Sequence, residues 1–374
     1  MKIVQVKTGD ERTRYYLSKD DGSPVVPVLK YLQFKDNYGL ARNTLRMQCI
    51  HLKHFFTYME ECEKDYQLIT IDDLSSFIAW LKNSSIKKSV VTLRFEPEHQ
   101  PQTINANIDT VIMFFDYLLR HEGMENHLSK KLVKFIQSPK KNYRGFLYGI
   151  ADNKKVKSHI LKLPVPKNRV KTITKKDTAI LLETCRNMRD YFLLYLLFET
   201  GMRIGEALSL WLEDFDMSEY IIYVNDRGET ENLAEIKTVS SPRKLNCTQE
   251  LMDIFTEYVC KFHTYEIKTN HVFLKLKGLN SGKAMDYVDV DNLFRKLRKR
   301  TNIDITPHIF RHTSLSLLYA AGWQPELIRI RAGHKNIYTT MNTYVHPSDE
   351  TIAEEFKKVS DALKMPPLDK EAEE

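Results

Sequence analysis

Three segments in the first third of the chain carry apolar residues spaced three or four positions apart. They begin at Asn43, Thr70 and Thr103. This spacing places the apolar side chains on one stripe of a helix, and short helices with one such stripe have to pack against one another. We therefore expect a helical domain over residues 37–136. Its predicted stripes are Leu45, Cys49, Leu52, Phe56 and Met59; Leu74, Phe77, Ile78 and Leu81; and Ile104, Ile108, Val111, Phe115 and Leu118.

The first 36 residues show a different pattern, in which apolar and polar residues alternate. Apolar residues occur at 3–6 and again at 15–17, a turn sequence occupies 20–24, and another apolar run follows at 25–29. Alternation with a period of two is typical of strands, and Asp, Gly, Ser and Pro favour turns. We expect an N-terminal β-hairpin extension over residues 1–36.

Helical patterns also dominate the second half of the chain. A helix starts at Thr174, and a strongly apolar helix over 190–199 is expected to stop at Gly201. Residues 220–224 and 234–237 are predicted to form paired strands, with a return near Lys244. Further helices are predicted at 204–211, 290–299, 308–320, 325–332 and 338–344. The pattern indicates a second domain over residues 173–347, mainly α with a small β-sheet or hairpin, and then an acidic tail helix over 348–374.

Positive charge is concentrated between the two predicted domains. The chain has a net charge of +7, but residues 130–176 alone hold 15 basic residues and one acidic residue, Asp152. Pro and Gly without periodicity predict an extended basic linker over 137–172. Such a stretch suits contact with nucleic acid, although a solvated linker has the same composition. The candidate DNA-binding residues are Lys140, Lys141, Arg144, Lys154, Lys155 and Lys157.

Composition argues against membrane and secreted proteins. The chain lacks an apolar run of about eighteen residues, and charge occurs too early at the N-terminus for a signal peptide. The five cysteines are odd in number and include no CxxC pair, which disfavours a disulfide framework and a structural zinc site. We expect a reduced, cytoplasmic protein with no membrane partner.

Two short motifs in the second predicted domain bring basic side chains together. Arg203 follows a glycine stop at the start of the next helix, where Glu206 can pair with it. His308, Arg311 and His312 share one face of a later helix. Two histidines four residues apart could bind zinc, but no third ligand stands at a supporting spacing, so we expect no metal site.

A third motif adds a histidine after Gly333 and a candidate nucleophile further on. Tyr344 has a hydroxyl that can attack phosphorus, but a phenol with a pKa of about 10 needs a base and strong electrostatic help. Two guanidinium groups can neutralise a phosphoryl transition state without a metal. The side chains suited to one phosphate are Arg203, Arg311, His308 and His334.

The order of these residues resembles that of the tyrosine recombinases, the phage integrase family. It comprises Arg203, a lysine on a hairpin, the HxxRH sequence at 308–312, Gly333-His334 and Tyr344. The resemblance covers about residues 174–347, and its combined motif is highly specific although each piece is not. The helical domain upstream matches the core-binding domain of this family in position and type. The resemblance implies a two-domain recombinase fold.

The resemblance also implies a role for each residue. Arg203 and Arg311 would clamp the scissile phosphate, with Glu206 and His312 in support. His308 matches the general base and His334 the second phosphate-binding position. Lys237 would protonate the leaving 5′ oxygen, with Lys244 as the alternative. Tyr344 lies ten residues after His334, the family's usual spacing, whereas Tyr338 lies only four after it.

These roles imply a site-specific DNA recombinase that serves a transposon or a phage. It would act on duplex recombination sites through a 3′-phosphotyrosine, as a tetramer on two duplexes, without metal or ATP and with accessory proteins as further candidate partners. Three alternatives stay open: an inactive DNA-binding regulator on the same scaffold, a resolvase, and an enzyme similar to type IB topoisomerases. A metal-dependent nuclease is disfavoured, since no carboxylate cluster of the two-metal type stands out.

Overall fold

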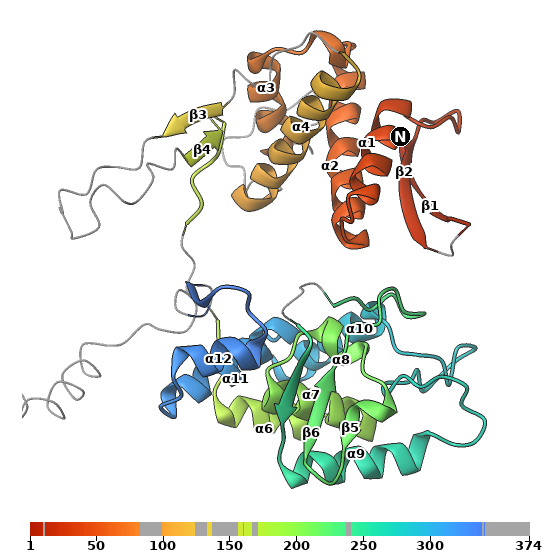
Figure 1. Ribbon diagram of the computed structural model, residues 1–374, viewed down its shortest axis with the longest axis vertical. Helices are drawn as coiled ribbons and strands as arrows, with labels where there is room; N and C mark the ends of the chain where they lie inside the picture. Colours follow the sequence, from red (N-terminus) through yellow and green to blue (C-terminus); the bar gives the residue numbers. More distant parts are fainter. Residues whose placement is uncertain are drawn as a thin grey trace, which may run out of the picture. The chain divides into compact units, whose positions relative to one another are not determined.

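The computed structural model describes residues 1–9, 12–82, 99–123, 133–136, 156–159, 161–166, 171–236, 241–338 and 340. The chain divides into two compact units, Met1–Lys167 and Asn168–Glu374 (Figure 1). Both units are mostly helical, and their sheets have two or three strands. Within the described part of the chain, no helix is long and apolar enough to cross a membrane.

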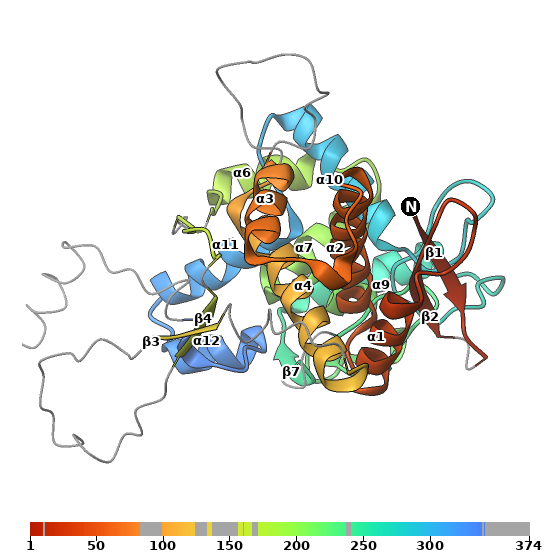
Figure 2. The same ribbon diagram turned by 90° about the horizontal axis from the view of Figure 1, so that it is seen from above.

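The first unit opens with an antiparallel pair of strands, β1 (Lys2–Lys7) and β2 (Thr13–Ser18). Helix α1 (Val26–Asn37) follows, and Figures 1 and 2 both show it beside this pair. The hairpin prediction for residues 1–36 was therefore wrong in its second half. The hairpin turns between β1 and β2 rather than at 20–24, and residue 26 begins a helix. Pro27 suits the first turn of a helix, and Val28, Tyr31 and Leu32 bury a helical stripe instead of alternating.

The three predicted helices of the first unit are confirmed as α2 (Arg42–Glu61), α3 (Ile71–Lys82) and α4 (Pro101–His121). A short 3-10 turn, Tyr66–Leu68, lies between α2 and α3. The apolar stripes of these helices meet in one core, whose aromatic centre contains edge-to-face contacts. The largest fully buried side chains of this core are Tyr31, Phe55, Phe77, Phe114 and Phe115.

Two strands follow, β3 (Val133–Ile136) and β4 (Val156–His159), and they pair antiparallel. The predicted helical domain therefore ends before residue 133, and the predicted linker contains a strand. Residues 161–166 are held against α4. The Asn105 amide donates to the Leu163 carbonyl over 3.0 Å and accepts from its N–H over 2.9 Å. Lys162 pairs with Asp109 over 3.2 Å.

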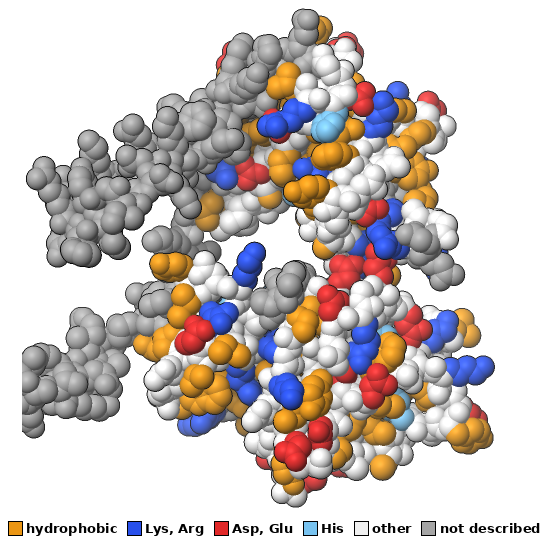
Figure 3. Space-filling view, in the orientation of Figure 1, with side chains coloured by type: hydrophobic (Ala, Val, Ile, Leu, Met, Phe, Trp, Pro, Cys, Tyr) orange, Lys and Arg blue, Asp and Glu red, His pale blue; other side chains and the backbone are white. Residues whose placement is uncertain are grey.

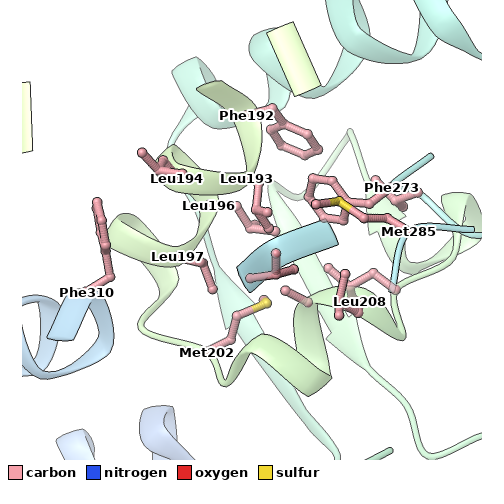
Figure 4. Close-up of a cluster of buried hydrophobic side chains, with 14 of the residues drawn as sticks. Phe192, Leu193, Leu194, Leu196, Leu197, Met202, Leu208, Phe273, Met285 and Phe310 are labelled. Carbon is pink, nitrogen blue, oxygen red and sulfur yellow. The ribbon is translucent and has the colours of Figure 1, made fainter. Parts of the chain in front are cut away.

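The second unit is built on helix α7 (Met188–Thr200), which is apolar on nearly all sides. Figure 4 shows its side chains turned toward residues from several other segments. The segments that join this core are distant in sequence, so α7 is the centre around which the unit packs. The α7 residues concerned are Phe192, Leu193, Leu194, Leu196 and Leu197, and their labelled neighbours are Met202, Leu208, Phe273, Met285 and Phe310.

The other helices of this unit surround α7. Helix α6 (Lys175–Glu183) starts at the predicted Thr174, whose side chain and Asp177 form a capping box. The predicted helices in this unit are confirmed with adjusted ends, except that 338–344 lies largely outside the described residues. Helix α9 was not predicted from the sequence. The remaining helices are α8 (Ile204–Leu208), α9 (Gln249–Phe262), α10 (Tyr287–Thr301), α11 (Pro307–Ala320) and α12 (Pro325–Ala332).

The small sheet of the second unit differs from the predicted one. Its strand order is β5 (Phe215–Asp216), β6 (Ile221–Val224), β7 (Arg243–Asn246), all antiparallel, and a 3-10 turn, Leu212–Asp214, precedes it. The partner of β6 is therefore the strand at 243–246 and not the described residues 234–236 of the predicted strand. Residues 234–236 are irregular because the Asn232 side chain binds the Ala234 N–H and two backbone carbonyls, those of Leu208 and Met285.

We expect Asn105→Ala to release residues 161–166 from α4. The substitution removes both hydrogen bonds to the Leu163 backbone, so the Leu163 amide hydrogen becomes open to solvent. Hydrogen–deuterium exchange followed by mass spectrometry would show at least tenfold faster exchange in this peptide, on the order of 1.4 kcal/mol of lost protection. Gln102→Ala, an exposed change on the same helix, is the matched control. Unchanged exchange at Leu163 in Asn105→Ala would contradict this anchoring role.

Candidate active site

The predicted Arg203 and Arg311 approach one another from different elements. Helix α7 ends at Gly201 with a φ of 63°, and the chain turns there so that Arg203 caps the start of α8. Arg311 lies in the middle of α11 and is buried. Its Nη1 donates to the Gly201 carbonyl over 2.8 Å. Gly201 therefore has two roles: it ends α7 just before Arg203, and its carbonyl holds the side chain of Arg311.

The C-terminal end of α12 is the surface on which these arginines meet. The last carbonyls of a helix have no partner within the helix and carry negative partial charge, so they attract guanidinium groups. Here the last two carbonyls of the helix, that of its C-cap Gly333 and that of the next residue, His334, each accept from a different arginine. The bonds are Arg243 Nε to Arg331 O (2.7 Å), Arg311 Nη2 to Ala332 O (2.6 Å), Arg203 Nη2 to Gly333 O (3.1 Å) and Arg329 Nη1 to His334 O (2.9 Å).

The carboxylate of Glu206 lies among these arginines and is 1% exposed. Its Oε1 accepts from Arg203 Nη1 over 2.8 Å and from Arg243 Nη1 over 3.1 Å. Its Oε2 accepts from the Arg203 N–H over 2.8 Å and from Arg243 Nη2 over 2.9 Å. Burial alone would raise the pKa of Glu206, but the hydrogen bonds and charge of Arg243, with the charges of Arg203 and Arg311, lower it to about 2. Glu206 is therefore ionised.

His334 binds Arg311 directly. Its Nε2 lies 2.9 Å from Arg311 Nη2, and its Nδ1 lies 2.9 Å from the Thr340 hydroxyl. Burial and then the charges of Arg311, Arg203 and Arg243 lower the pKa of His334 to about 3, so the ring is neutral. Because a guanidinium only donates, Nε2 must accept and Nδ1 must carry the proton that goes to Thr340. In this arrangement His334 orients Arg311.

The two histidines of α11 lie in different environments. His308 is exposed, and its ring centroid is 6.4 Å from that of His312, one turn further along the helix. Burial, followed by the charges of His308 and Arg311, lowers the pKa of His312 to about 4. On the face that these residues share, His308 is therefore open to solvent, whereas Arg311 is buried and His312 is partly buried.

Several predicted site residues lie outside the described residues: Lys237, Tyr344, Lys140, Lys141, Arg144, Lys154 and Lys155. Lys157 lies in β4, of which the structure describes the backbone. The alternative lysine, Lys244, is exposed on β7, with its Nζ 5.3 Å from the centre of the Tyr223 ring. The alternative tyrosine, Tyr338, is 67% exposed, and its N–H donates to Asn336.

Sequence reasoning missed two residues of this region. Arg243 was not singled out from the sequence, because a basic residue where a hairpin returns is a weak signal. Gly205 has a packing role, since a Cβ there would lie 2.6 Å from Tyr287 Oη and 2.8 Å from the Glu235 carbonyl. Only glycine lets the backbone that precedes Lys237 approach α8 this closely. Among the described residues, no three His, Cys, Asp or Glu side chains are grouped to hold a metal ion.

We expect Glu206→Gln to make stability less dependent on pH. The pKa of Glu206 is about 2 in the folded chain against an ordinary value of 4.5, so its ionisation stabilises the fold above pH 4.5 and this contribution is lost as the pH falls toward 2. The free energy of unfolding should fall by about 3 kcal/mol at neutral pH, and the difference from wild type should shrink below about pH 5. Urea unfolding between pH 3 and 7 measures this.

Glu213→Gln is the matched control for that experiment. Glu213 pairs with Arg227 over 3.3 Å, but its side chain is exposed to solvent. Its loss should therefore change stability by less than about 1 kcal/mol at any pH. A Glu206→Gln difference that stays constant across the pH range would mean that the charge of Glu206 does not stabilise the fold.

Comparison with known proteins connects this geometry to a family. Residues 171–351 match the phage integrase family. The chain is 32% identical over 359 residues to transposase A from transposon Tn554 of Staphylococcus aureus, which covers 96% of this chain and 98% of that protein. It is 24% identical over 332 residues to tyrosine recombinase XerD of Staphylococcus haemolyticus, which covers 88% of this chain and 96% of that protein.

The fold is also similar to that of solved recombinases. A structure of the Tn1549 transposon integrase in complex with transposon right end DNA has a TM-score of 0.59 and 19% identity, and the match covers 90% of this chain and 98% of that one. This likeness confirms the predicted mainly helical, two-domain recombinase architecture. The Tn554 relative extends the match over both units. On these grounds the chain belongs to the phage integrase family of tyrosine recombinases.

Proposed function

We propose that this chain is the site-specific recombinase of a mobile element, an integrase or transposase that cuts and rejoins duplex DNA. The observation that supports this most is the arginine cluster at the end of α12. Arg203 and Arg311 donate to adjacent carbonyls, so their guanidinium groups are held side by side. Arg329 at this helix end is paired with Glu326, and the other three arginines, Arg203, Arg243 and Arg311, share one carboxylate, Glu206. A phosphodiester supplies the anion that would balance this excess positive charge.

In the proposed reaction the Tyr344 oxygen attacks a phosphorus of the DNA backbone. A P–O bond to tyrosine forms as the P–O5′ bond breaks, which leaves a 3′-phosphotyrosine and a 5′ hydroxyl. His308 takes the proton of the phenol, and Lys237 gives a proton to the departing 5′ oxygen. A 5′ hydroxyl from a second strand then reverses these steps. One phosphodiester replaces another throughout, so the bond energy is conserved without ATP.

The role of His334 in this proposal follows from its hydrogen bonds. Its neutral Nε2 accepts from Arg311, so it holds that guanidinium in place instead of donating to the phosphate itself. Arg311 is thereby held from three sides, by Gly201, Ala332 and His334. A side chain fixed in this way needs little reorganisation when charge develops on the phosphate.

The proposed partner is a duplex recombination site, bound by a tetramer that holds two duplexes. The Tn1549 neighbour was solved with transposon right end DNA, which supports a DNA substrate for this chain. On the face of the second unit seen in Figure 3, Lys and Arg side chains are spread among apolar and acidic ones. We propose that backbone contacts come from the linker residues Lys140, Lys141, Arg144, Lys154, Lys155 and Lys157.

We expect Tyr344→Phe to abolish covalent attachment to DNA, because a phenylalanine has no oxygen to attack phosphorus. Nicked duplexes that carry the sequences flanking the gene would trap the intermediate, and denaturing electrophoresis with peptide mass spectrometry would detect and locate it. DNA binding should persist. Tyr338→Phe removes the same hydroxyl six residues earlier and is the matched control, with an expected change of less than about twofold.

The same assay separates the competing functions. Loss of the adduct in Tyr338→Phe alone would overturn the assignment of the nucleophile but keep the reaction. Tight DNA binding by wild type without any adduct would favour the inactive regulator. Relaxation of supercoils without strand exchange would favour a topoisomerase, and joining of separate molecules supports the recombinase.

We expect Lys237→Ala to slow cleavage of ordinary DNA by about 10²- to 10⁴-fold, the usual contribution of a general acid. A substrate whose 5′ bridging oxygen is replaced by sulfur should restore most of the rate, because a thiolate leaves without a proton. Single-turnover cleavage of both substrates measures this. Lys244→Ala is the control. If sulfur rescues Lys244→Ala and not Lys237→Ala, Lys244 is the acid.

A further inference from the structure

Arg243 occupies an unusual position for a residue at the start of a strand. It is the first residue of β7, yet its side chain is only 6% exposed. Its Nε donates to the Arg331 carbonyl and its Nη1 to the Ser241 carbonyl, both over 2.7 Å. The two terminal nitrogens also bind both oxygens of Glu206. Arg243 therefore joins the sheet, α8 and the end of α12.

The contacts of Arg243 and Arg203 with Glu206 are symmetrical. Each oxygen of the carboxylate accepts one hydrogen bond from each arginine residue. Arg243 makes a forked, two-bond contact, the strongest geometry for a guanidinium and a carboxylate. On the other side, Glu206 holds the backbone N–H and the side chain of Arg203. The position of Arg203 therefore depends on the orientation of Glu206, which Arg243 sets.

We propose that Arg243 is a positioning residue for strand cleavage: it holds Glu206 so that Glu206 presents Arg203 to the scissile phosphate. This inference rests on the proposed function. Arg243 does not itself contact the phosphate in this scheme, because four of its five N–H donors already bind Glu206 and two backbone carbonyls. Arg203 is the more exposed of the two, with 19% of its side chain accessible against 6%.

The physical reason is the cost of a buried carboxylate. Glu206 is surrounded by Arg203 on its own helix, Arg243 on β7, Arg311 on α11 and His334 after α12. Without Arg243, burial dominates and raises the pKa of Glu206 from about 2, so the side chain takes up a proton more readily. A protonated Glu206 binds Arg203 less strongly, and Arg203 loses its fixed direction.

A double-mutant cycle in the adduct assay tests this role. We expect Arg243→Gln to slow single-turnover cleavage roughly 100-fold, as for a misplaced catalytic group. The double variant with Glu206→Gln should be no slower than Glu206→Gln alone, since the residue through which Arg243 acts has already lost its charge. If the two effects multiply instead, Arg243 acts on the phosphate independently and the proposal is wrong.

The pH profile distinguishes positioning from a merely structural effect. The ratio of the wild-type rate to the Arg243→Gln rate should grow as the pH falls from 7 to 5, because Glu206 becomes protonated only in the variant. The same ratio for the double variant should stay flat. Arg243→Lys keeps the charge and should restore a flat ratio with part of the rate. A flat ratio for Arg243→Gln would overturn the proposal.

Arg189→Gln is the matched control for loss of a buried arginine. Arg189 is 13% exposed and binds Asp190 and the Leu274 carbonyl, away from the cluster. It should lower stability without any change in the pH dependence of cleavage. If wild type itself forms no adduct, the proposed function fails. Urea unfolding then still shows whether Arg243 holds Glu206, since the stability lost in Arg243→Gln should be larger at pH 7 than at pH 3.

Discussion

The second unit is organised by the free carbonyls at the end of α12. A helix that ends inside a protein leaves its last carbonyls without partners, and a buried carbonyl without a donor is costly. In this chain arginines from β7, the N-cap of α8, α11 and α12 itself donate to successive carbonyls, from the last turn of α12 through its C-cap to His334. Each arginine donates to a backbone carbonyl at the same helix end. The positions of the guanidinium groups relative to one another are therefore set by the backbone geometry of that end.

This arrangement explains how like charges can stay together in the absence of a phosphate. Three guanidinium groups in one place repel one another, and burial makes the repulsion stronger. Glu206 removes part of the excess charge, and the partial negative charge of the helix end removes more. The groups are therefore held in place before an anion binds, which under the proposed function is the condition for stabilising charge in a transition state without reorganisation.

The helices that sequence patterns predicted best are those with a single apolar stripe. The stripes of Leu45, Leu74 and Ile104 and their partners are buried in α2, α3 and α4 as expected. The hydrophobic pattern predicted the wrong secondary structure in two segments, residues 25–29 and 234–236. Residues 25–29 looked like a strand because Val25, Val26 and Val28 favour strands in isolation, yet packing of Val28 and Tyr31 on the core made them helical. Residues 234–236 do not form the predicted strand, because the hydrogen bonds of the Asn232 side chain hold the backbone there in an irregular conformation.

The sequence by itself determined the kind of site: Arg203 after a glycine stop, the HxxRH sequence, and a histidine after Gly333. Each of these features involves residues that are close together along the chain, so it can be recognised from the sequence alone. Only the tertiary structure decided that Arg243 shares Glu206 with Arg203, and that His334 accepts a hydrogen bond from Arg311. The contact of Arg243 with Glu206 joins residues 37 positions apart, and that of Arg311 with His334 joins residues 23 positions apart. The partners of these arginines are backbone carbonyls that the end of α12 leaves unpaired. Which arginine reaches which carbonyl depends on how the helices and the sheet pack.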